Sequence, residues 1–417
     1  MRQTKQQTLN KTKVGCYNSF NMKRFWILFG VTTGVFLILF ILASTIDFDI
    51  SWGLAGNKFV HTWTYGSSDT IRYYSTNGWD NFIECFGDSL SFLVPSFFCW
   101  VLCFTFFKKV TNQQYVVYRR IAQVVIPLFL MAASVWFVTY FNYSSDGLLT
   151  LLKLCNAQIN DSLLLLSCIA LSLIINLAFA MIVWKLGENT QMSLIKLAFA
   201  IFITFIFSKI MIWVLKRQCD INRERFRALV TDPRCWLLTE SGVSTLNYDL
   251  AKDCFQQWWG HTPVSYESGW TTGTNAVATA FINSRIGGSV SNAFDSFPSG
   301  HSADGAHILI LLYLPCCIKQ ANDKKWKPYL IWVIILGVTL TIMFTRVSAG
   351  AHYLSDTTWG SMLTAVPILI FGTIFCSIDK IRTWFGKSDI NSAWYQFTIL
   401  QIILPISMIL SFMLPQW

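Results

Sequence analysis

The chain is dominated by apolar runs long enough to cross a lipid bilayer, and this feature limits its fold more than any other. A bilayer core about 30 Å thick needs roughly 20 consecutive apolar residues in a helix. Nine such runs lie at residues 25–44, 87–107, 121–142, 162–184, 193–215, 302–318, 329–345, 356–376 and 395–414. Because backbone polar groups inside a membrane must be satisfied within the segment, we expect an all-α, polytopic bundle of about nine transmembrane helices.

The composition agrees with a membrane protein and argues against a nucleic-acid-binding one. Charged residues make up only 13% of the 417 residues, whereas soluble domains carry about 25%. The net charge of +10 comes from lysines and arginines in the short segments between apolar runs, where they set membrane orientation. The basic segment 1–24 before a long apolar run favours an uncleaved anchor over a cleaved signal peptide.

The distribution of basic residues predicts the orientation of the chain. In a nine-span protein, five basic segments fall on the same side: 1–24, 108–120, 185–196, 319–327 and 380–387. Cytoplasmic loops carry the excess of lysine and arginine, so the N-terminus is expected in the cytoplasm. The short loops favour a bacterial inner membrane. The long loop 216–301 then lies on the periplasmic, extracytoplasmic side.

A turn motif, Pro298-Ser299-Gly300-His301, precedes the sixth apolar run. Gly300 allows close approach of the backbone to a ligand, and the first N–H groups of a helix attract anions such as phosphate. His301 can exchange a proton near neutral pH. The motif therefore offers Ser299 and Gly300 as phosphate-binding candidates and His301 as a candidate acid and base, although a plain helix cap is the alternative.

A second group of polar residues surrounds the start of the eighth run: Arg346, His352 and Asp356. A carboxylate four residues after a histidine lies on the same helix face and can bind one ring nitrogen. Such a contact fixes the tautomer and makes the other nitrogen nucleophilic. The arginine fork suits phosphate oxygens. A surface hydrogen bond and an interfacial arginine are the simpler alternatives.

Basic residues also follow the fifth run, on the side that the charge rule disfavours. Lys216 and Arg223 are candidates for binding phosphate oxygens. Lys209 lies two turns earlier within the run, so it is either an intramembrane functional residue or a lysine that reaches to the surface. His307, inside the sixth run, is expected to pack or to form a hydrogen bond.

Taken in order, these motifs resemble those of the type 2 phosphatidic acid phosphatase (PAP2) superfamily of integral-membrane lipid phosphatases. The family pattern is Lys-x6-Arg-Pro, then Pro-Ser-Gly-His, then Ser-Arg-x5-His-x3-Asp. The chain departs from it at Glu224, in place of the proline, and at Thr345, in place of the serine. The resemblance implies a six-helix core at 121–376. Residues 1–120 would add a cytoplasmic tail and two helices, and 377–417 a cytoplasmic loop and one helix.

The resemblance also implies a metal-free reaction in two steps. His352 would attack phosphorus and Asp356 would orient it, while His301 would protonate the leaving oxygen and then activate water. The groups holding the phosphate oxygens would be Lys216, Arg223 and Arg346, with backbone N–H groups near Ser299 and Gly300. Glu224 leaves Arg223 the least certain of these assignments, because Arg225 or Arg227 can serve instead.

We therefore expect a phosphatase for a lipid phosphate monoester or diphosphate, of the phosphatidate, phosphatidylglycerol phosphate, undecaprenyl diphosphate or lipid A type. Two alternatives stay open: a phosphotransferase acting on a second lipid or a sugar, and a non-catalytic anionic-lipid binder or transporter. The second has less support, because nucleophile, acid and carboxylate are all present. We expect no metal, cofactor or nucleic-acid partner. The sequence leaves open the oligomeric state and any disulfide among Cys219, Cys235 and Cys254.

Overall fold

The computed structural model describes residues 22–55, 61–65, 69–73, 78–109, 161–218, 226, 236–238, 244–255, 257, 296–314 and 327–377. The long helices are α2 (Met22–Thr45), α4 (Gly78–Lys109), α7 (Asp161–Lys185), α8 (Glu188–Trp213), α15 (Lys327–Ser348) and α16 (Leu354–Ser377). The short ones are α3 (Asp47–Ala55), α10 (Tyr248–Cys254), α13 (Gly300–Gly305), the π-helix η2 (Val214–Gln218) and the 3-10 helix η4 (Ala306–Tyr313).

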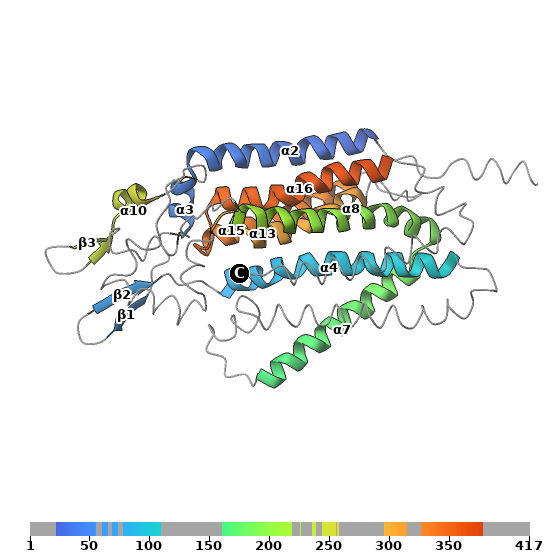
Figure 1. Ribbon diagram of the computed structural model, residues 1–417, viewed down its shortest axis with the longest axis horizontal. Helices are drawn as coiled ribbons and strands as arrows, with labels where there is room; N and C mark the ends of the chain where they lie inside the picture. Colours follow the sequence, from blue (N-terminus) through green and yellow to red (C-terminus); the bar gives the residue numbers. More distant parts are fainter. Residues whose placement is uncertain are drawn as a thin grey trace, which may run out of the picture.

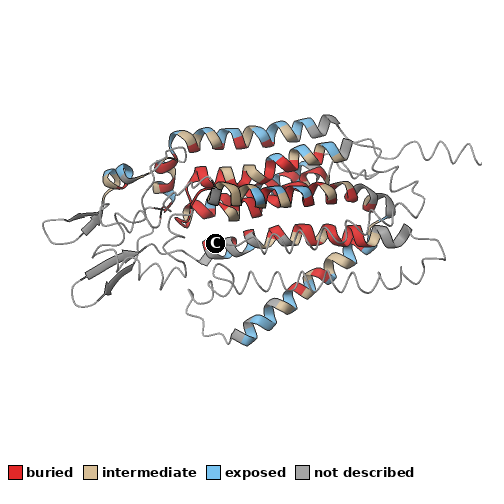
Figure 2. Cartoon of the chain, in the orientation of Figure 1, coloured by how far each residue is buried: buried red, intermediate tan, exposed pale blue. Residues whose placement is uncertain are grey.

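The long helices form a bundle around a short central segment. α13 and η4 contact α4, α15 and α16, while α16 also packs against α8 and α2 (Figure 1). α7 contacts α4 and slants away from the other helices (Figure 1). Buried faces point inward (Figure 2), and the main core draws residues from most of these helices: Phe36, Phe98, Ile201, Ile310, Leu336 and Ile368.

The outer faces of the bundle are apolar as well. Leu37 of α2, Ile174 of α7 and Val333 of α15 are all exposed large hydrophobic residues. A soluble protein buries such contiguous surface, whereas a helix in lipid presents it to the acyl chains. These helices are therefore apolar on both their buried and their exposed faces, as in an integral membrane protein.

Most of the expected spans coincide with helices, but the count of nine stays a prediction. Among the described residues, four helices are long and apolar enough to cross a membrane: Leu165–Lys185, Leu194–Lys216, Tyr329–Ser348 and Leu354–Phe375. The bent pair α2–α3, with 92° between its halves, makes five if it is counted as one span. The expected spans 121–142 and 395–414 lie outside the described residues, so the six-helix core is also untested.

The sixth expected span, 302–318, differs from a regular transmembrane helix. The α-helical part ends at Gly305, and a 3-10 helix continues to Tyr313. Because a 3-10 helix rises about 2.0 Å per residue rather than 1.5 Å, eight residues reach about 4 Å further. The Tyr313 hydroxyl donates to the Leu369 carbonyl at 2.8 Å. The short central segment is thus stretched and is anchored on α16.

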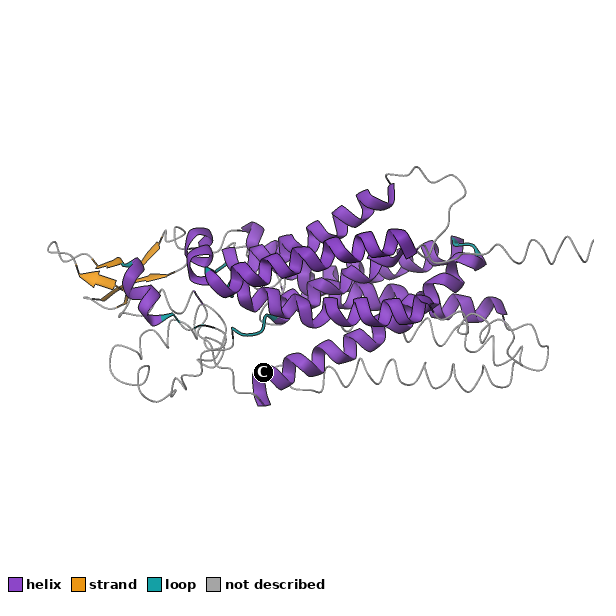
Figure 3. Ribbon diagram, turned by 90° about the horizontal axis from the view of Figure 1, so that it is seen from above, coloured by secondary structure: helices purple, strands orange, loops and turns teal. Residues whose placement is uncertain are grey.

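Two small hairpins are the exception to the all-α prediction, which is right for the bundle. β1 (His61–Tyr65) pairs with β2 (Asp69–Tyr73), and β3 (Trp236–Leu238) pairs with β4 (Ser244–Leu246), both antiparallel. Threonine, tryptophan and tyrosine, which favour strands, recur in the first pair. Both hairpins lie beyond one end of the bundle, on the side of α3 and α10 (Figures 1 and 3).

Candidate active site

The Pro298 motif forms a tight turn that ends at the N-terminus of α13. The Phe297–Pro298 peptide bond is cis. Ser299 is the N-cap residue of α13, and its hydroxyl oxygen accepts from the Ser302 N–H at 3.3 Å and from the Ser302 hydroxyl at 3.0 Å. This cap satisfies one of the unpaired donors of the helix end. His301, half-buried, is thereby held in the first turn of α13.

The turn is docked directly on the first turns of α16. The Ser299 N–H donates to the Asp356 carbonyl at 3.0 Å, and the Ser361 hydroxyl donates to the Ser302 carbonyl at 3.2 Å. A Cβ atom on Gly360 would lie 2.1 Å from the Ser299 carbonyl oxygen, so only glycine permits this approach. The second and third motifs of the sequence are therefore brought together through backbone contacts.

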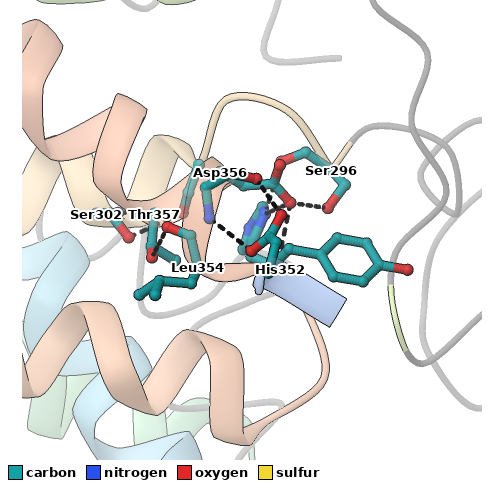
Figure 4. Close-up of polar contacts among 10 residues, drawn as sticks. Ser296, Ser302, His352, Leu354, Asp356 and Thr357 are labelled. Carbon is teal, nitrogen blue, oxygen red and sulfur yellow. Dashed lines mark hydrogen bonds and ion pairs between the residues drawn. The ribbon is translucent and has the colours of Figure 1, made fainter. Parts of the chain in front are cut away.

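His352 lies in the turn between α15 and α16, two residues before α16 begins, and is only 2% exposed. Its Nδ1 atom is 2.7 Å from the Ser296 carbonyl oxygen (Figure 4). A carbonyl oxygen only accepts hydrogen bonds, so Nδ1 carries the proton of the neutral ring. The lone pair of the ring is then on Nε2.

Asp356 does not make the contact expected of it, because its carboxylate does not form a hydrogen bond with His352. Its Oδ2 atom is 3.9 Å from His352 Nδ1, which is too long for a hydrogen bond. Instead Oδ2 accepts from the Ser296 hydroxyl at 2.5 Å and from the Tyr353 N–H at 2.9 Å (Figure 4). The carboxylate holds the same residue, Ser296, whose carbonyl oxygen orients the ring.

Arg346 lies near the C-terminus of α15 and is only 1% exposed. Its carbonyl oxygen accepts from the His352 N–H at 3.3 Å, which closes the turn that carries the histidine. Gly350 has a φ of 64° in this turn, a left-handed conformation that favours glycine. Thr345, the threonine in the family's serine position, uses its hydroxyl within α15, donating to the Ile342 carbonyl at 3.0 Å.

A second polar cluster lies deeper between the helices. Lys209 Nζ is 2.7 Å and 2.9 Å from the two carboxylate oxygens of Asp304. The His307 ring has Nδ1 3.1 Å from the Asp304 carbonyl oxygen and Nε2 3.4 Å from the Ser208 hydroxyl. Lys209 is therefore ion-paired inside the bundle, and His307 forms the hydrogen bond expected of it.

These contacts also place Lys216. Ser208 contacts His307 in η4, whereas the next residue, Lys209, contacts Asp304 in α13, so α8 runs antiparallel to the continuous α13–η4 segment. Two further turns along the helix bring Lys216, in the π-helix η2, to the end of the bundle where the α13 N-terminus lies. Such π-bulges are frequent at functional sites. Arg223 and Glu224 lie outside the described residues, as do Arg225 and Arg227.

Four residues that the sequence did not single out take part in this arrangement: Ser296, Tyr353, Gly360 and Asp47. Tyr353 contributes only its backbone N–H, and the other three contact residues that are remote in the chain, so no side-chain pattern in the sequence marks them. Cys219 and Cys235 lie outside the described residues, and the side chain of Cys254 is not described. Within the described ranges, no three His, Cys, Asp or Glu side chains gather closely enough to hold a metal ion.

Comparison with known protein families matches residues 228–376 to the PAP2 superfamily. This part of the chain is a PAP2 superfamily domain, as the resemblance predicted, and it contains His301, His352 and Asp356. Lys216 and Arg223 precede it. Neither the curated proteins nor the solved structures contain a match to the chain. The domain indicates phosphatase-type activity, and the apolar helices indicate an integral membrane protein.

Proposed function

We propose that this protein is a lipid phosphatase, which hydrolyses a phosphate monoester or diphosphate of a membrane lipid through a phosphohistidine intermediate. The observation that carries the proposal is the 2.7 Å contact between His352 Nδ1 and the Ser296 carbonyl oxygen. It keeps the lone pair of the neutral ring on Nε2, the atom that must attack phosphorus. The PAP2 superfamily domain supports the phosphatase class.

In the first step, a bond forms between His352 Nε2 and phosphorus while the bond from phosphorus to the lipid oxygen breaks. His301 donates a proton to that oxygen, and the lipid leaves as an alcohol, or as a monophosphate when the substrate is a diphosphate. Positive charge develops on the His352 ring, whose Nδ1–H stays bonded to the Ser296 carbonyl. Asp356, 3.9 Å from Nδ1, stabilises that charge.

In the second step, water attacks phosphorus, His301 accepts its proton, and the nitrogen–phosphorus bond breaks. Inorganic phosphate leaves and the His352 ring is restored. Phosphoryl transfer depends mainly on neutralising the phosphate oxygens, and the candidates for this are Lys216, Arg223 and Arg346. Because the Ser299 N–H donates to the Asp356 carbonyl, we assign Ser299 to holding the turn and the phosphate contact there to the Gly300 N–H.

The reaction is proposed to take place at the extracytoplasmic face of a bacterial inner membrane, because the basic loops lie on the opposite side of the expected topology. The lipid tail is proposed to lie against the apolar helices around the site, with its phosphate at the buried polar residues. The face is checked by introducing Lys252→Cys and treating intact cells with a membrane-impermeant maleimide. Labelling above that of the unsubstituted protein is expected. Labelling that requires permeabilised cells would reverse the proposed orientation.

The function is tested by phosphate release from a panel of lipid phosphates and diphosphates, with purified protein in detergent and EDTA present. Three proteins are compared: wild type, His352→Ala and His61→Ala, the last carrying its change in the β1 strand outside the bundle. We expect His352→Ala to lower release at least about a thousandfold, as removal of a nucleophile does. His61→Ala should match wild type.

A second readout runs the reaction with a radiolabelled lipid as the substrate and then quenches it. Wild type should retain an acid-labile, alkali-stable phosphoryl group, and His352→Ala should not. Full activity of His352→Ala, or release that EDTA abolishes, would contradict the mechanism. Absence of release by wild type, with label passing to a second lipid or sugar, would identify a phosphotransferase.

A further inference from the structure

The helices that precede the PAP2 domain in sequence are built into its candidate active site. The domain match begins at residue 228, whereas α2 and α3 lie within the first 55 residues. Ala43, near the end of α2, packs with Val347 and Leu354. These two residues flank the turn that carries His352. The corner between α2 and α3, which is bent by 92°, therefore covers that turn.

Asp47, the first residue of α3, has a buried carboxylate aimed at the start of α16. It is 1% exposed. One oxygen, Oδ1, accepts from the Ser355 N–H at 2.9 Å, and the other, Oδ2, accepts from the Ser355 hydroxyl at 2.5 Å. The two residues are 308 positions apart in the chain. Both oxygens of a buried carboxylate are thus satisfied, as burial of a charge requires.

This contact supplies a helix cap that α16 cannot provide for itself. The residue before α16 is Tyr353, whose side chain packs in an aromatic cluster with Phe226 and Phe255. An N-cap side chain normally accepts the N–H of the second helical residue, which here is Ser355. Asp47, which belongs to α3, accepts this N–H in place of an N-cap residue of α16. Its negative charge also suits the N-terminal end of a helix.

The first turn of α16, which Asp47 caps, also contains Asp356 of the candidate active site. Asp356 follows Ser355 directly, and its carboxylate accepts from the Tyr353 N–H at 2.9 Å, the reciprocal half of a capping box. The same carboxylate holds Ser296, whose carbonyl oxygen lies 2.7 Å from His352 Nδ1. A shift of the first turn of α16 would therefore move the groups that set the His352 tautomer.

A second line of contacts joins α2 to the other half of the site. The Phe40 ring of α2 is 5.8 Å from the Trp359 ring of α16. The Trp359 ring is in turn 6.2 Å from the Phe297 ring, next to Pro298. The N-terminal helices thus support both the α16 terminus and the turn that docks on it.

We infer that Asp47 is a positioning residue of the candidate active site, which fixes the first turn of α16 and through it Asp356 and His352. The α2–α3 segment is then part of the catalytic unit, although it precedes the family domain. The kinetic part of this inference rests on the proposed phosphatase function, whereas the structural part does not.

The kinetic test compares Asp47→Ala, Asp47→Asn and the control Asp49→Asn, with kcat and KM measured on the lipid phosphate that wild type hydrolyses best. Asp47→Ala should lower kcat about tenfold and change KM less than about threefold, because misplacement of reacting groups acts on the chemical step. Asp47→Asn should stay within about threefold of wild type, since asparagine caps as well as aspartate. Asp49 lies on the same helix but is exposed, so Asp49→Asn should match wild type.

An activity-independent readout uses histidine labelled with ¹⁵N. The His352 signals, assigned by their loss in His352→Ala, should show the Nδ1–H tautomer in wild type, Asp47→Asn and Asp49→Asn. In Asp47→Ala the other tautomer should become populated. If Asp47→Ala fails to fold, Ser355→Ala replaces it, since it removes only the 2.5 Å contact; its kcat should fall about threefold.

The outcomes separate the two proposals. Wild-type kcat and an unchanged His352 spectrum in Asp47→Ala, or in Ser355→Ala when it stands in, would overturn the role of Asp47 and leave the phosphatase proposal intact. No phosphate release by wild type would overturn the phosphatase proposal, and the ¹⁵N spectra alone would then decide whether Asp47 positions His352.

Discussion

His352 and His307 are both buried, but His352 lies in the turn between α15 and α16, whereas His307 lies in the 3-10 helix η4. In each ring Nδ1 faces a backbone carbonyl oxygen, at 2.7 Å from that of Ser296 and 3.1 Å from that of Asp304. The two rings therefore hold the same tautomer. Their surroundings differ, because His307 Nε2 faces the Ser208 hydroxyl inside the bundle, whereas His352 lies in a turn at its end. The fixed tautomer leaves the lone pair on Nε2 in both rings, and the position of His352 in the end turn, rather than inside the bundle, makes it the candidate nucleophile.

The two clusters are also held together by different kinds of contact. The His352 cluster depends on backbone groups, since the Ser296 carbonyl contacts His352 and the Ser299 N–H donates to the Asp356 carbonyl of α16. The His307 cluster is tied by the ion pair between Lys209 and Asp304. Changes to the ion pair should therefore lower stability first, and changes to the docked turn should lower activity first.

The largest effect on stability is expected from Lys209→Met, which leaves the Asp304 carboxylate buried without its ion-pair partner. Removing one member of a buried pair lowers the free energy of unfolding by about 3–5 kcal/mol, and the loss here should be at or below the lower end because the Lys209 side chain is 21% exposed. The thermal midpoint in detergent should fall accordingly, and the double variant Lys209→Met with Asp304→Leu should recover most of the loss. Activity per folded molecule should stay within about threefold. An unchanged midpoint with a large loss of kcat would instead assign Lys209 to the site.

Gly360→Ala should show the opposite behaviour, with activity falling more than stability. The added Cβ would lie 2.1 Å from the Ser299 carbonyl oxygen, so the turn must move away from α16. A displacement of about 1 Å can lower the rate about a hundredfold. Gly337→Ala in α15 is the matched control, because its Cβ would meet nothing within 4 Å. Equal kcat values for the two variants would show that docking of the turn does not matter for catalysis.

The sequence predicted the parts of the site that form local motifs. The turn at Pro298–His301 and the residues Arg346, His352 and Asp356 were expected at helix ends, and they lie there, because apolar runs mark where helices begin. The same runs predicted most helices of the bundle. The 3-10 continuation at Ala306–Tyr313 was not predicted, since an apolar run does not distinguish helix types.

The missing parts depend on contacts that no local pattern encodes. His352 Nδ1 contacts the backbone carbonyl of Ser296. Every residue has a backbone carbonyl, so the sequence does not single out Ser296. Asp47 reaches Ser355 across 308 positions, and the need for glycine at Gly360 follows from how closely α16 approaches the turn. The four-residue spacing suggested Asp356 as the direct partner of His352, which would hold if both residues were on one helix. His352 instead lies in the turn before α16.

Ser296→Ala and Ser208→Ala compare two hydroxyl groups beside the two histidines. Ser296→Ala removes the 2.5 Å contact to Asp356 but keeps the carbonyl that faces His352. Loss of a hydrogen bond to a charged group is worth about 1.5 kcal/mol or more, so kcat should fall about tenfold. Ser208→Ala removes a 3.4 Å contact to His307 and should change kcat less than about twofold. Similar losses in both variants would contradict the distinction between the clusters.

The smallest effect is expected from Lys252→Met, which breaks a pair of the same residue types as Lys209 and Asp304 but on the surface. Lys252 Nζ is 3.0 Å from Asp49 Oδ1, with both side chains exposed. The hydrogen bond with the Tyr248 hydroxyl, and then that with Asp49, raises the pKa of Lys252 above its ordinary value of 10.5. An exposed pair contributes little, so at pH 7 the thermal midpoint should change by less than about 2 °C.

The direction of the pH dependence follows from that raised pKa. A cation whose pKa is higher in the folded state contributes its stability fully below the unfolded value, here 10.5, and loses it as the pH rises through the folded value. The small difference between wild type and Lys252→Met should therefore be constant from pH 6 to about 9 and be lost as the pH rises through the raised pKa of Lys252. A difference as large as that of Lys209→Met would show that burial does not separate the two pairs.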